Sequence, residues 1–406
     1  MNIDIRRVTM DEFEDYVASM QRGFSEHVDE QDREIYRGLF KHERAFAAYD
    51  GELIVGTTST IPFRMTIPGC TALPLAGVTA VTVQPTHRRR GILTQMMRCQ
   101  LEDARDHGQP LAALWASETS IYGRFGFGMA VQLERWRIDR SRTAFEHRPE
   151  ATGRVRFVDK DEALRLYPEV MNRVCEQRAG MIPLEKPLWE AHLHDLPRWR
   201  DGASAYFHAV YEVDGRADGY VMYRVKQDWT SGVPPTLRVA ELVAVTDAAH
   251  AALWRFVLDI DLIGHIEAAG RPPDDAVAWM LTDSRRLERR VYDGMWLRIV
   301  DVAAALSARG YSQPGSVVLQ VEDKFLPANG GRFALAAGPG GAECNPTRRK
   351  PDVTLSASDL AAIYLGGVSV GTLARAGRVR EEKAGGLARA DAMFATDRAP
   401  WCVVDF

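Results

Sequence analysis

The chain has 406 residues, of which 46% are hydrophobic and 26% are charged, and its net charge at neutral pH is −4. This composition is typical of a globular protein with two or three domains, and its slight acidity excludes a general basic surface for nucleic acid. No apolar run reaches the roughly 20 residues that a membrane-spanning helix needs, and the first residues do not form a signal peptide. We therefore expect a cytoplasmic protein without nucleic-acid or membrane partners.

The cysteines are scattered and contain no CxxC pair; they are Cys70, Cys99, Cys175, Cys344 and Cys402. Reduced thiols are the expectation for such a set in a cytoplasmic protein. The nearest approach to a metal-ligand pattern is His192-x-His194-Asp195, which is too weak to predict zinc. We expect no bound metal.

The N-terminal segment begins with a helix and antiparallel strands. Thr9 to Glu12 is a capping box, and apolar residues then recur at helical spacing from Phe13 to Phe24. Asp50-Gly51 is the turn signal of a hairpin from Arg44 to Gly56, and a further strand is expected from Ile61 to Ile67. The segment after Phe24 is acidic, through Glu26, Asp29, Glu30, Asp32 and Glu34. It is either a solvated helix face or the rim of a pocket that favours amines.

The stretch from Val81 to Leu93 predicts a strand, a turn and a helix. The alternating apolar run at Val81 and Val83 stops at Pro85, and three arginines and Gly91 follow. The helix that comes next has one apolar face, formed by Leu93, Met97, Leu101 and Ala104. A basic, glycine-containing turn before a helix N-terminus offers free backbone N–H groups and a favourable dipole to a phosphate.

A second short strand from Leu111 to Trp115 leads through Ala116-Ser117-Glu118 to Tyr122-Gly123-Arg124-Phe125-Gly126-Phe127. The order strand, basic turn, helix, strand and Tyr-x-x-x-Gly-Phe resembles the core of the GNAT superfamily of N-acetyltransferases. The usual turn in that superfamily is Gln/Arg-x-x-Gly-x-Gly/Ala. Arg88 and Gly91 fit it, whereas Leu93 stands where a small residue is usual.

The next part of the chain repeats this plan without the phosphate-binding residues. A hairpin from Ala205 to Val225 turns at Asp214-Gly215, and Leu242 to Thr246 is similar to Val78 to Thr82. A helix is then expected from Ala249 to Ile263 and a strand from Ala276 to Leu281. The segment Thr246 to His250 contains an aspartate and no glycine, so it is a poor diphosphate cradle. We interpret it as a degenerate copy.

From Asp301 the composition changes to short strands separated by glycine pairs. Strands are expected at Val317 to Val321 and Arg332 to Leu335, and helices at Ser358 to Tyr364 and Leu387 to Phe394. This part resembles a sterol-carrier-protein α+β domain. The chain ends in an apolar segment, Trp401 to Phe406, which we predict to be a docked strand because most free termini are polar and frayed.

The fold class is therefore predicted as α/β (α+β), with an active GNAT domain in residues 1–150, a degenerate GNAT-like domain in 151–300 and a sterol-carrier-like domain in 301–406. This order and the terminal phenylalanine resemble the Eis (enhanced intracellular survival) family of acetyltransferases. The resemblance covers the whole chain.

The resemblance implies acetyl transfer from acetyl-CoA to primary amines, with aminoglycosides as the first acceptors and with several amino groups of one acceptor open to acetylation. It implies Tyr122 as general acid and the α-carboxylate of Phe406 as general base. It also implies a homohexamer that is a dimer of trimers. The cofactor-binding residues that it implies are Val81, Thr82 and Val83 for the pantetheine arm, Arg89, Arg90, Gly91, Ile92, Leu93 and Thr94 for the pyrophosphate, and Ser117 and Glu118 at the second strand.

The two catalytic roles also make chemical sense independently. An attacking amine must lose a proton, and a buried α-carboxylate gains basicity over its reference pKa of roughly 3.5. Three alternatives stay open. The amine acceptor could be a polyamine or a protein lysine, the protein could carry a lipid or sterol, or it could bind acetyl-CoA as a signal without transfer.

Overall fold

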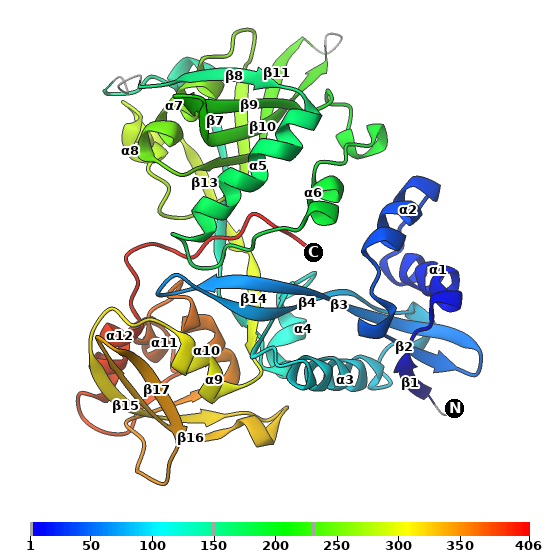
Figure 1. The fold of residues 1–406 in the computed structure, drawn as a ribbon, viewed down its shortest axis with the longest axis vertical. Coiled ribbons are helices and arrows are strands. Elements are labelled where there is room, and N and C mark those ends of the chain that lie inside the picture. The colour runs from blue at the N-terminus through cyan, green and yellow to red at the C-terminus, as the bar shows by residue number, and fades with distance from the viewer. Residues whose placement is uncertain (1–2, 148–151, 229–231) are drawn as a thin grey trace. The chain divides into compact units, whose positions relative to one another are not determined.

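The computed structural model describes residues 3–147, 152–228 and 232–406. The chain forms two compact units (Figure 1). The first contains Met1–Val131, Met295–Asp397 and Val404–Phe406, and the second contains Gln132–Gly294 and Arg398–Val403.

The first unit contains a mixed sheet of seven described strands in the order β1-β2-β3-β4-β5-β14-β6. Its strands are β1 (Ile3–Arg7), β2 (Ala45–Asp50), β3 (Leu53–Ile67), β4 (Thr71–Val83), β5 (Leu111–Trp115), β6 (Gly128–Met129) and β14 (Met295–Ile299). The helices beside it are α1 (Phe13–Phe24), α2 (Glu30–Leu39), α3 (Ile92–Asp106) and α4 (Thr119–Tyr122). The Thr9–Glu12 capping box and the hairpin at Asp50-Gly51 are both confirmed.

Helices α1 and α3 cover opposite faces of this sheet. Neighbouring residues of a strand point to opposite faces, so their contacts show which helix lies on which face. Ala47 of β2 packs with Tyr16 of α1, whereas Ala48 packs with Met96 of α3. Helix α3 therefore presents its first turn to one face of the sheet, directly after β4.

The third part of the chain has its own five-stranded sheet, β17-β16-β15-β18-β19, inside the first unit. The strands are β15 (Gly315–Glu322), β16 (Gly331–Gly338), β17 (Gly341–Pro346), β18 (Val353–Ser356) and β19 (Arg380–Glu381). Its helices are α9 (Val302–Ala308), α10 (Ala357–Tyr364), α11 (Val370–Arg375) and α12 (Gly386–Phe394). Helix α10 packs directly on β14 and β6 of the first sheet. A Cβ on Gly128 of β6 would lie 2.0 Å from the carbonyl oxygen of Ser358, so only glycine permits this approach.

The second unit contains the other seven-stranded sheet, in the order β13-β7-β12-β11-β10-β9-β8 among the described residues. The strands are β7 (Gln132–Asp139), β8 (Arg154–Val158), β9 (Phe207–Val213), β10 (Arg216–Asp228), β11 (Val233–Ala244), β12 (His265–Arg271) and β13 (Glu288–Asp293). The helices are α5 (Lys160–Cys175), α6 (Lys186–His192), α7 (Asp247–Asp259) and α8 (Val277–Met280). Both α5 and α7 pack on β10 and β11.

Near the end of each of the first two predicted domains, one strand pairs with the sheet of the other domain. Strand β7 precedes residue 151 but pairs with β12 and β13 of the second sheet. Strand β14 precedes residue 301 and follows the segment Gln132–Gly294 of the second unit, yet it pairs with β5 and β6 of the first sheet. Pairing partners so far apart in sequence leave no local signal.

Two predicted elements are wrong. The apolar run from Ala276 to Leu281 is not a strand but contains helix α8, because Pro272 and Pro273 end β12 and an Asp275 carboxylate oxygen accepts the N–H of Val277. The strand of this region lies earlier, as β12. The terminal segment Trp401 to Phe406 is buried in part but is not a strand.

Among the residues that the structure describes, each helix is too short or too polar to cross a bilayer.

Candidate active site

Strand β4 has an unpaired edge in its second half. It pairs with β5 only from Leu75 to Gly77, opposite Leu111 to Ala113, although it continues to Val83. Its other edge stays paired with β3 as far as Gly56 opposite Val83. Among the described residues, no strand therefore pairs with positions 78–83 on the β5 side. Such an edge binds extended ligands through backbone N–H and C=O groups.

A β-bulge shapes this edge at Ala80. Ala80 has φ of 53°, and the register shifts between Thr57 and Ser59 on the opposite strand. The Thr57 hydroxyl holds the bulge, since it donates to the Ala80 carbonyl and lies 2.7 Å from the Thr82 hydroxyl. The bulge re-aims Val81 to Val83 relative to the first half of the strand. Val81 and Val83 are half-buried and Thr82 is buried.

The turn after β4 has the conformation expected of an anion-binding loop. Arg89 has φ of 66° and Gly91 has φ of 78°, and Gly91 is the N-cap residue of α3. The first intrahelical bond runs from the N–H of Gln95 to the Gly91 carbonyl. The N–H groups of Ile92, Leu93 and Thr94 accordingly have no acceptor within the helix. Free N–H groups at this positive end of the helix dipole attract negative charge.

The arginines of the turn differ in their hydrogen bonds. Arg88 is tied down, because its guanidinium donates to the carbonyls of Val83 and Gly23, each at 3.3 Å. Arg90 donates to the Thr86 carbonyl at 3.1 Å. Arg89 is exposed and has no hydrogen-bond partner among the described residues, so its charge is available to a ligand.

The second strand leads to Tyr122. Ser117 and Glu118 follow β5 and are exposed, and Glu118 is the N-cap residue of α4. The Tyr122 ring is buried and packs edge-on against Phe127 at 6.0 Å. Its hydroxyl has no hydrogen-bond partner in the described structure. Burial raises the pKa of Tyr122 to about 12, although Arg124 opposes this shift, so the phenol stays protonated at neutral pH.

A buried ion pair supports the turn that follows Tyr122. Gly126 has φ of 84°, and a Cβ there would lie 2.1 Å from Nη1 of Arg298 on β14. Arg298 is fully buried and pairs with Asp323 of the third domain. Phe325, two residues further, packs on Phe125 with ring centroids 5.0 Å apart. The third domain thus contacts the same turn that carries the candidate general acid.

The end of the chain returns to the first unit. The indole N–H of Trp115 donates to the Val404 carbonyl at 3.2 Å. The Phe406 ring packs on Phe63 of β3, with centroids 5.0 Å apart. Tyr122, Phe406 and all the cofactor-binding residues named from the sequence therefore belong to one compact unit. The contacts of Trp115 and Phe63 were not predicted, because they join residues hundreds of positions apart.

The second sheet has a similar opening between β11 and β12, which we call the slot, and the side chains of this unit fill it. Strand β11 pairs with β12 only from Thr236 to Val239, although it continues to Ala244. Beyond this pairing, the guanidinium of Arg271 donates to the Leu242 carbonyl at 2.7 Å and pairs with Asp275 at 2.6 Å. His250 of α7 lies 2.9 Å from the other oxygen of Asp275.

This Arg271 network is sealed from solvent. The guanidinium lies over the rings of Trp136, Trp254 and Trp401, at 5.9, 5.3 and 5.0 Å from their centroids. Burial alone would raise the pKa of Asp275, but Arg271 and His250 outweigh it and hold that pKa below its usual range. The guanidinium of Arg271 thus occupies the position in the second sheet that corresponds to the open edge of β4.

The His192-x-His194-Asp195 segment is engaged in other contacts. His192 Nε2 lies 2.9 Å from Glu241, and Asp195 pairs with Arg200 and Arg224, each at 3.2 Å. No three His, Cys, Asp or Glu side chains gather as metal ligands within the described ranges.

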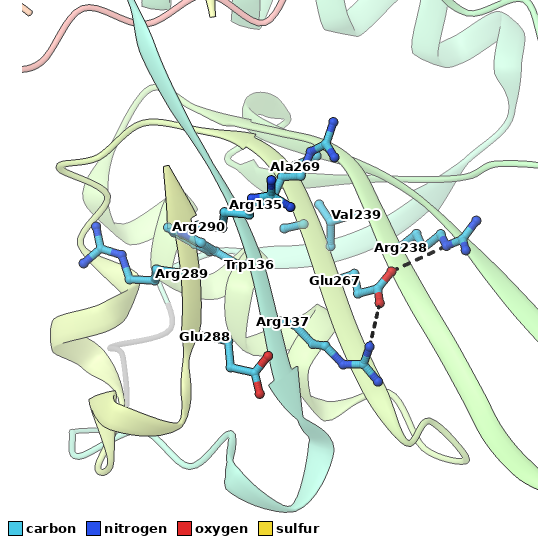
Figure 2. Close-up of a pocket in the computed structure, with 11 residues that line it drawn as sticks. Arg135, Trp136, Arg137, Arg238, Val239, Glu267, Ala269, Glu288, Arg289 and Arg290 are labelled. Carbon is cyan, nitrogen blue, oxygen red and sulfur yellow. Dashed lines mark hydrogen bonds and ion pairs between the residues drawn. The ribbon is translucent and has the colours of Figure 1, made fainter. Parts of the chain in front are cut away.

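The second unit also has an arginine-rich hollow of about 560 Å³ on strands β7, β11, β12 and β13 (Figure 2). Arg137 and Arg238 both point to Glu267, at 3.5 and 3.6 Å, and Arg289 pairs with Glu134 at 2.6 Å. Glu267 and Glu134 pair with these three arginines, and Arg135, Arg290 and Glu288 also line the hollow, so its lining carries charges of both signs.

Comparisons with known proteins agree with this arrangement. Residues 4–130 and 180–299 match models of the acetyltransferase (GNAT) domain, and residues 302–403 match the sterol carrier protein domain. The chain is thus a GNAT N-acetyltransferase with two GNAT domains and a sterol-carrier-type domain.

Full-length relatives define the family. An uncharacterized N-acetyltransferase of Streptomyces avermitilis is 42% identical, with 99% of both chains covered. The N-acetyltransferase Eis of Mycobacterium tuberculosis is 34% identical, with 98% of both chains covered. The crystal structure of Eis1 from Mycobacterium abscessus has a TM-score of 0.88 at 32% identity, covering 99% of this chain and 100% of that one. The protein belongs to the Eis family of N-acetyltransferases.

Proposed function

We propose that this protein transfers an acetyl group from acetyl-CoA directly to primary amines of a cationic acceptor, with aminoglycosides as the leading class. The observation that carries the proposal is the open edge of β4, which runs straight into the turn at Arg89 and Gly91. GNAT acetyltransferases use acetyl-CoA, and this edge and turn match the two chemical parts of that donor.

The donor has an amide-containing arm and a doubly charged pyrophosphate. The backbone of Val81, Thr82 and Val83 would bind the amides of the arm along the unpaired edge. Arg89, Arg90 and the N–H groups from Gly91 to Thr94 would hold the pyrophosphate. Ser117 and Glu118, at the end of the neighbouring strand, would line the other side of the arm.

The chemistry needs three proton transfers: two from the acceptor nitrogen and one to the leaving thiolate. An acceptor amine is mostly ammonium at neutral pH, so the α-carboxylate of Phe406 would take its proton before the nitrogen attacks the thioester carbonyl. The C–N bond forms as the C–S bond breaks, and the leaving thiolate would take a proton from Tyr122. The nitrogen loses its second proton as the amide forms, and through solvent this proton would restore Tyr122. The proton held by Phe406 then passes to solvent, so an ammonium acceptor releases one proton overall.

The pKa of about 12 at Tyr122 bears on the proton transfer to the thiolate. A thiol has a reference pKa of roughly 8.5, so full transfer to a solvated thiolate would be uphill. Burial raises the pKa of a thiol as well as that of a phenol, which brings the two groups closer together. Tyr122 would thus stabilise the developing thiolate as a protonated hydrogen-bond donor and complete the transfer as the thiolate leaves.

The acidic segment after α1 supports a polycationic acceptor. Asp29 and Asp32 form the capping box of α2, so these two carboxylates have a structural role. Glu26, Glu30 and Glu34 are exposed and have no ion-pair partner among the described residues. The segment begins beside the β4 edge, because a Cβ on Gly23 would lie 2.4 Å from Cβ of Thr82. Its negative charge would attract aminoglycosides, and polyamines or protein lysines are the other candidates.

The lipid-carrier alternative is less well supported. The Arg309 guanidinium is buried in the third domain and donates to the carbonyls of Tyr364, Gly310 and Phe394 at 2.6 to 2.7 Å. A cation at this position is a poor lining for an apolar tunnel. By family resemblance, we also propose a cytoplasmic homohexamer made of two trimers.

The test is thiol release from acetyl-CoA, measured with neomycin, spermidine and a lysine-containing peptide as acceptors. We expect the highest kcat/KM with neomycin, and a product whose mass has grown by one or more acetyl groups. If acetyl-CoA binds but no amine leads to thiol release, the result would support the signal-binding alternative and contradict the proposal. Transfer to spermidine or the peptide alone would change the acceptor class but keep the reaction.

A further inference from the structure

The last three residues of the chain are held by two side chains of the first GNAT domain. Terminal residues usually fray unless something ties them down. Val404 is nevertheless buried, and both ring and carbonyl contacts fix residues 404–406 in the first unit. The contacts come from Trp115 and Phe63, which lie on strands of the same sheet.

Trp115 provides a rigid donor to the tail. It is the last residue of β5, and its backbone is fixed opposite Met295 of β14. Its indole N–H donates to the Val404 carbonyl at 3.2 Å, two residues before the terminal carboxylate. An indole has one N–H donor and no acceptor, so this bond fixes the direction of the ring and of the tail together.

Phe63 provides the second contact, to the ring of Phe406. It is 7% exposed, lies opposite Leu75 in the pairing of β3 with β4, and packs on Phe406 with an interplanar angle of 50°. Gly77 makes room for it, since a Cβ there would lie 2.5 Å from the Phe63 ring. The absence of a side chain at Gly77 thus leaves the Phe63 ring in the position where it meets Phe406.

We propose that Trp115 and Phe63 are positioning residues that hold the Phe406 carboxylate where it can accept the amine proton. The inference rests on the proposed function, in which that carboxylate is the general base. A base at the free end of a chain must be confined to within hydrogen-bond reach of its proton, because misplacement by about 1 Å is costly to the rate. One hydrogen bond and one ring contact, on either side of Asp405, provide this confinement.

The experiment combines a structural and a kinetic measurement on the full-length protein. The variants are Trp115→Phe, which removes the N–H and keeps a ring, and Phe63→Leu, which removes the aromatic contact. Trp279→Phe is the matched control, because Trp279 is 85% exposed. Release of Phe406 by a carboxypeptidase with a preference for aromatic ends reports how firmly the tail is held. Thiol release reports kcat and the KM for acetyl-CoA, and circular dichroism checks the fold.

We expect Phe406 to be released roughly three- to tenfold faster from Trp115→Phe, the factor that one net hydrogen bond represents. The value of kcat should fall by a similar factor with little change in the KM for acetyl-CoA, and Phe63→Leu should behave alike. The control should match the unaltered protein in both assays.

Unchanged release of Phe406 from both variants would overturn the inference, whatever happens to kcat. Faster release with an unchanged kcat would also overturn it, because the tail would then be held without consequence for proton transfer. Addition of one glycine after Phe406 tests the proposed function separately. If that extension leaves kcat intact, the base assignment fails, whereas the release rates still show whether Trp115 and Phe63 hold the tail.

Discussion

Replacement of Gly126 by alanine should destabilise the first unit far more than an ordinary glycine substitution. The residue has φ of 84°, which costs an alanine about 1–2 kcal/mol. The new Cβ would also lie 2.1 Å from Nη1 and 2.7 Å from Cζ of Arg298, which is fully buried in its pair with Asp323. Breaking a buried pair costs about 3–5 kcal/mol. The expected loss of about 4–7 kcal/mol is a large part of the 5–15 kcal/mol that stabilises a typical domain.

Urea unfolding followed by circular dichroism measures this loss. Gly108→Ala is the matched control, because Gly108 lies in the same domain with φ of 65° and a Cβ there would meet no atom within 4 Å. It should lose only the backbone cost of about 1–2 kcal/mol. The difference between the two variants isolates the collision with Arg298. Thiol release well below the unfolding midpoint should also fall for Gly126→Ala, since Tyr122 lies on the same turn.

Equal losses in Gly126→Ala and Gly108→Ala would refute the argument. A double-mutant cycle sharpens it, because Arg298→Met removes the guanidinium with which the Cβ collides. In the Arg298→Met variant, the Asp323 carboxylate still accepts hydrogen bonds from the N–H groups of Phe325 and Leu326. Gly126→Ala should therefore cost several kcal/mol less when Arg298 is methionine, and an unchanged cost would show that the two residues are independent.

Three further predictions concern the donor site, the candidate acid and the filled slot. Arg89→Ala should raise the KM for acetyl-CoA about tenfold and weaken its dependence on salt, measured by thiol release at two ionic strengths. Arg89 is an exposed cation of the turn that has no hydrogen-bond partner among the described residues. Tyr122→Phe should lower kcat about a hundredfold. Because burial raises the pKa of Tyr122 to about 12, the unfolded chain loses this proton first, and folding stability falls as the pH rises from about 10 to about 12. The variant should lack this contribution of up to about 2.7 kcal/mol, which urea unfolding near the two ends of that interval would detect. Arg271→Met should cost about 3–5 kcal/mol by leaving the buried Asp275 without its guanidinium partner, and it should leave one acetyl-CoA bound per chain in calorimetric titration.

The parts of the fold that the sequence predicts best are those set by neighbouring residues. Pro85 ends a strand, Gly91 permits a positive φ, and apolar spacing from Leu93 marks a helix, so the order around the donor turn followed from local rules. The capping box at Thr9 and the turn at Asp50-Gly51 are of the same kind. Each of these features is complete within a few positions of the chain.

The features that could not be predicted depend on distant partners. An apolar run such as Ala276 to Leu281 fits a strand or a helix equally well until Asp275 caps it. The pairing of β14 with β5 joins residues separated by the segment Gln132–Gly294 of the second unit. The holding of Phe406 by Phe63 and of Arg298 by Asp323 likewise depends on which sheets and domains meet.

The difference between the open and the filled slot comes down to one comparable position. The last residue of β5 that pairs with β4 is Ala113, and the last residue of β12 that pairs with β11 is Ala268. Three residues further along, the chain has Ala116 directly after β5 and Arg271 as the last residue of β12. A methyl group leaves the gap between the diverging strands open, whereas a guanidinium crosses it and binds the facing carbonyl of Leu242. The duplicated scaffold therefore supplies the same divergence twice. Under the proposed function, the size of this side chain would determine which copy binds the donor.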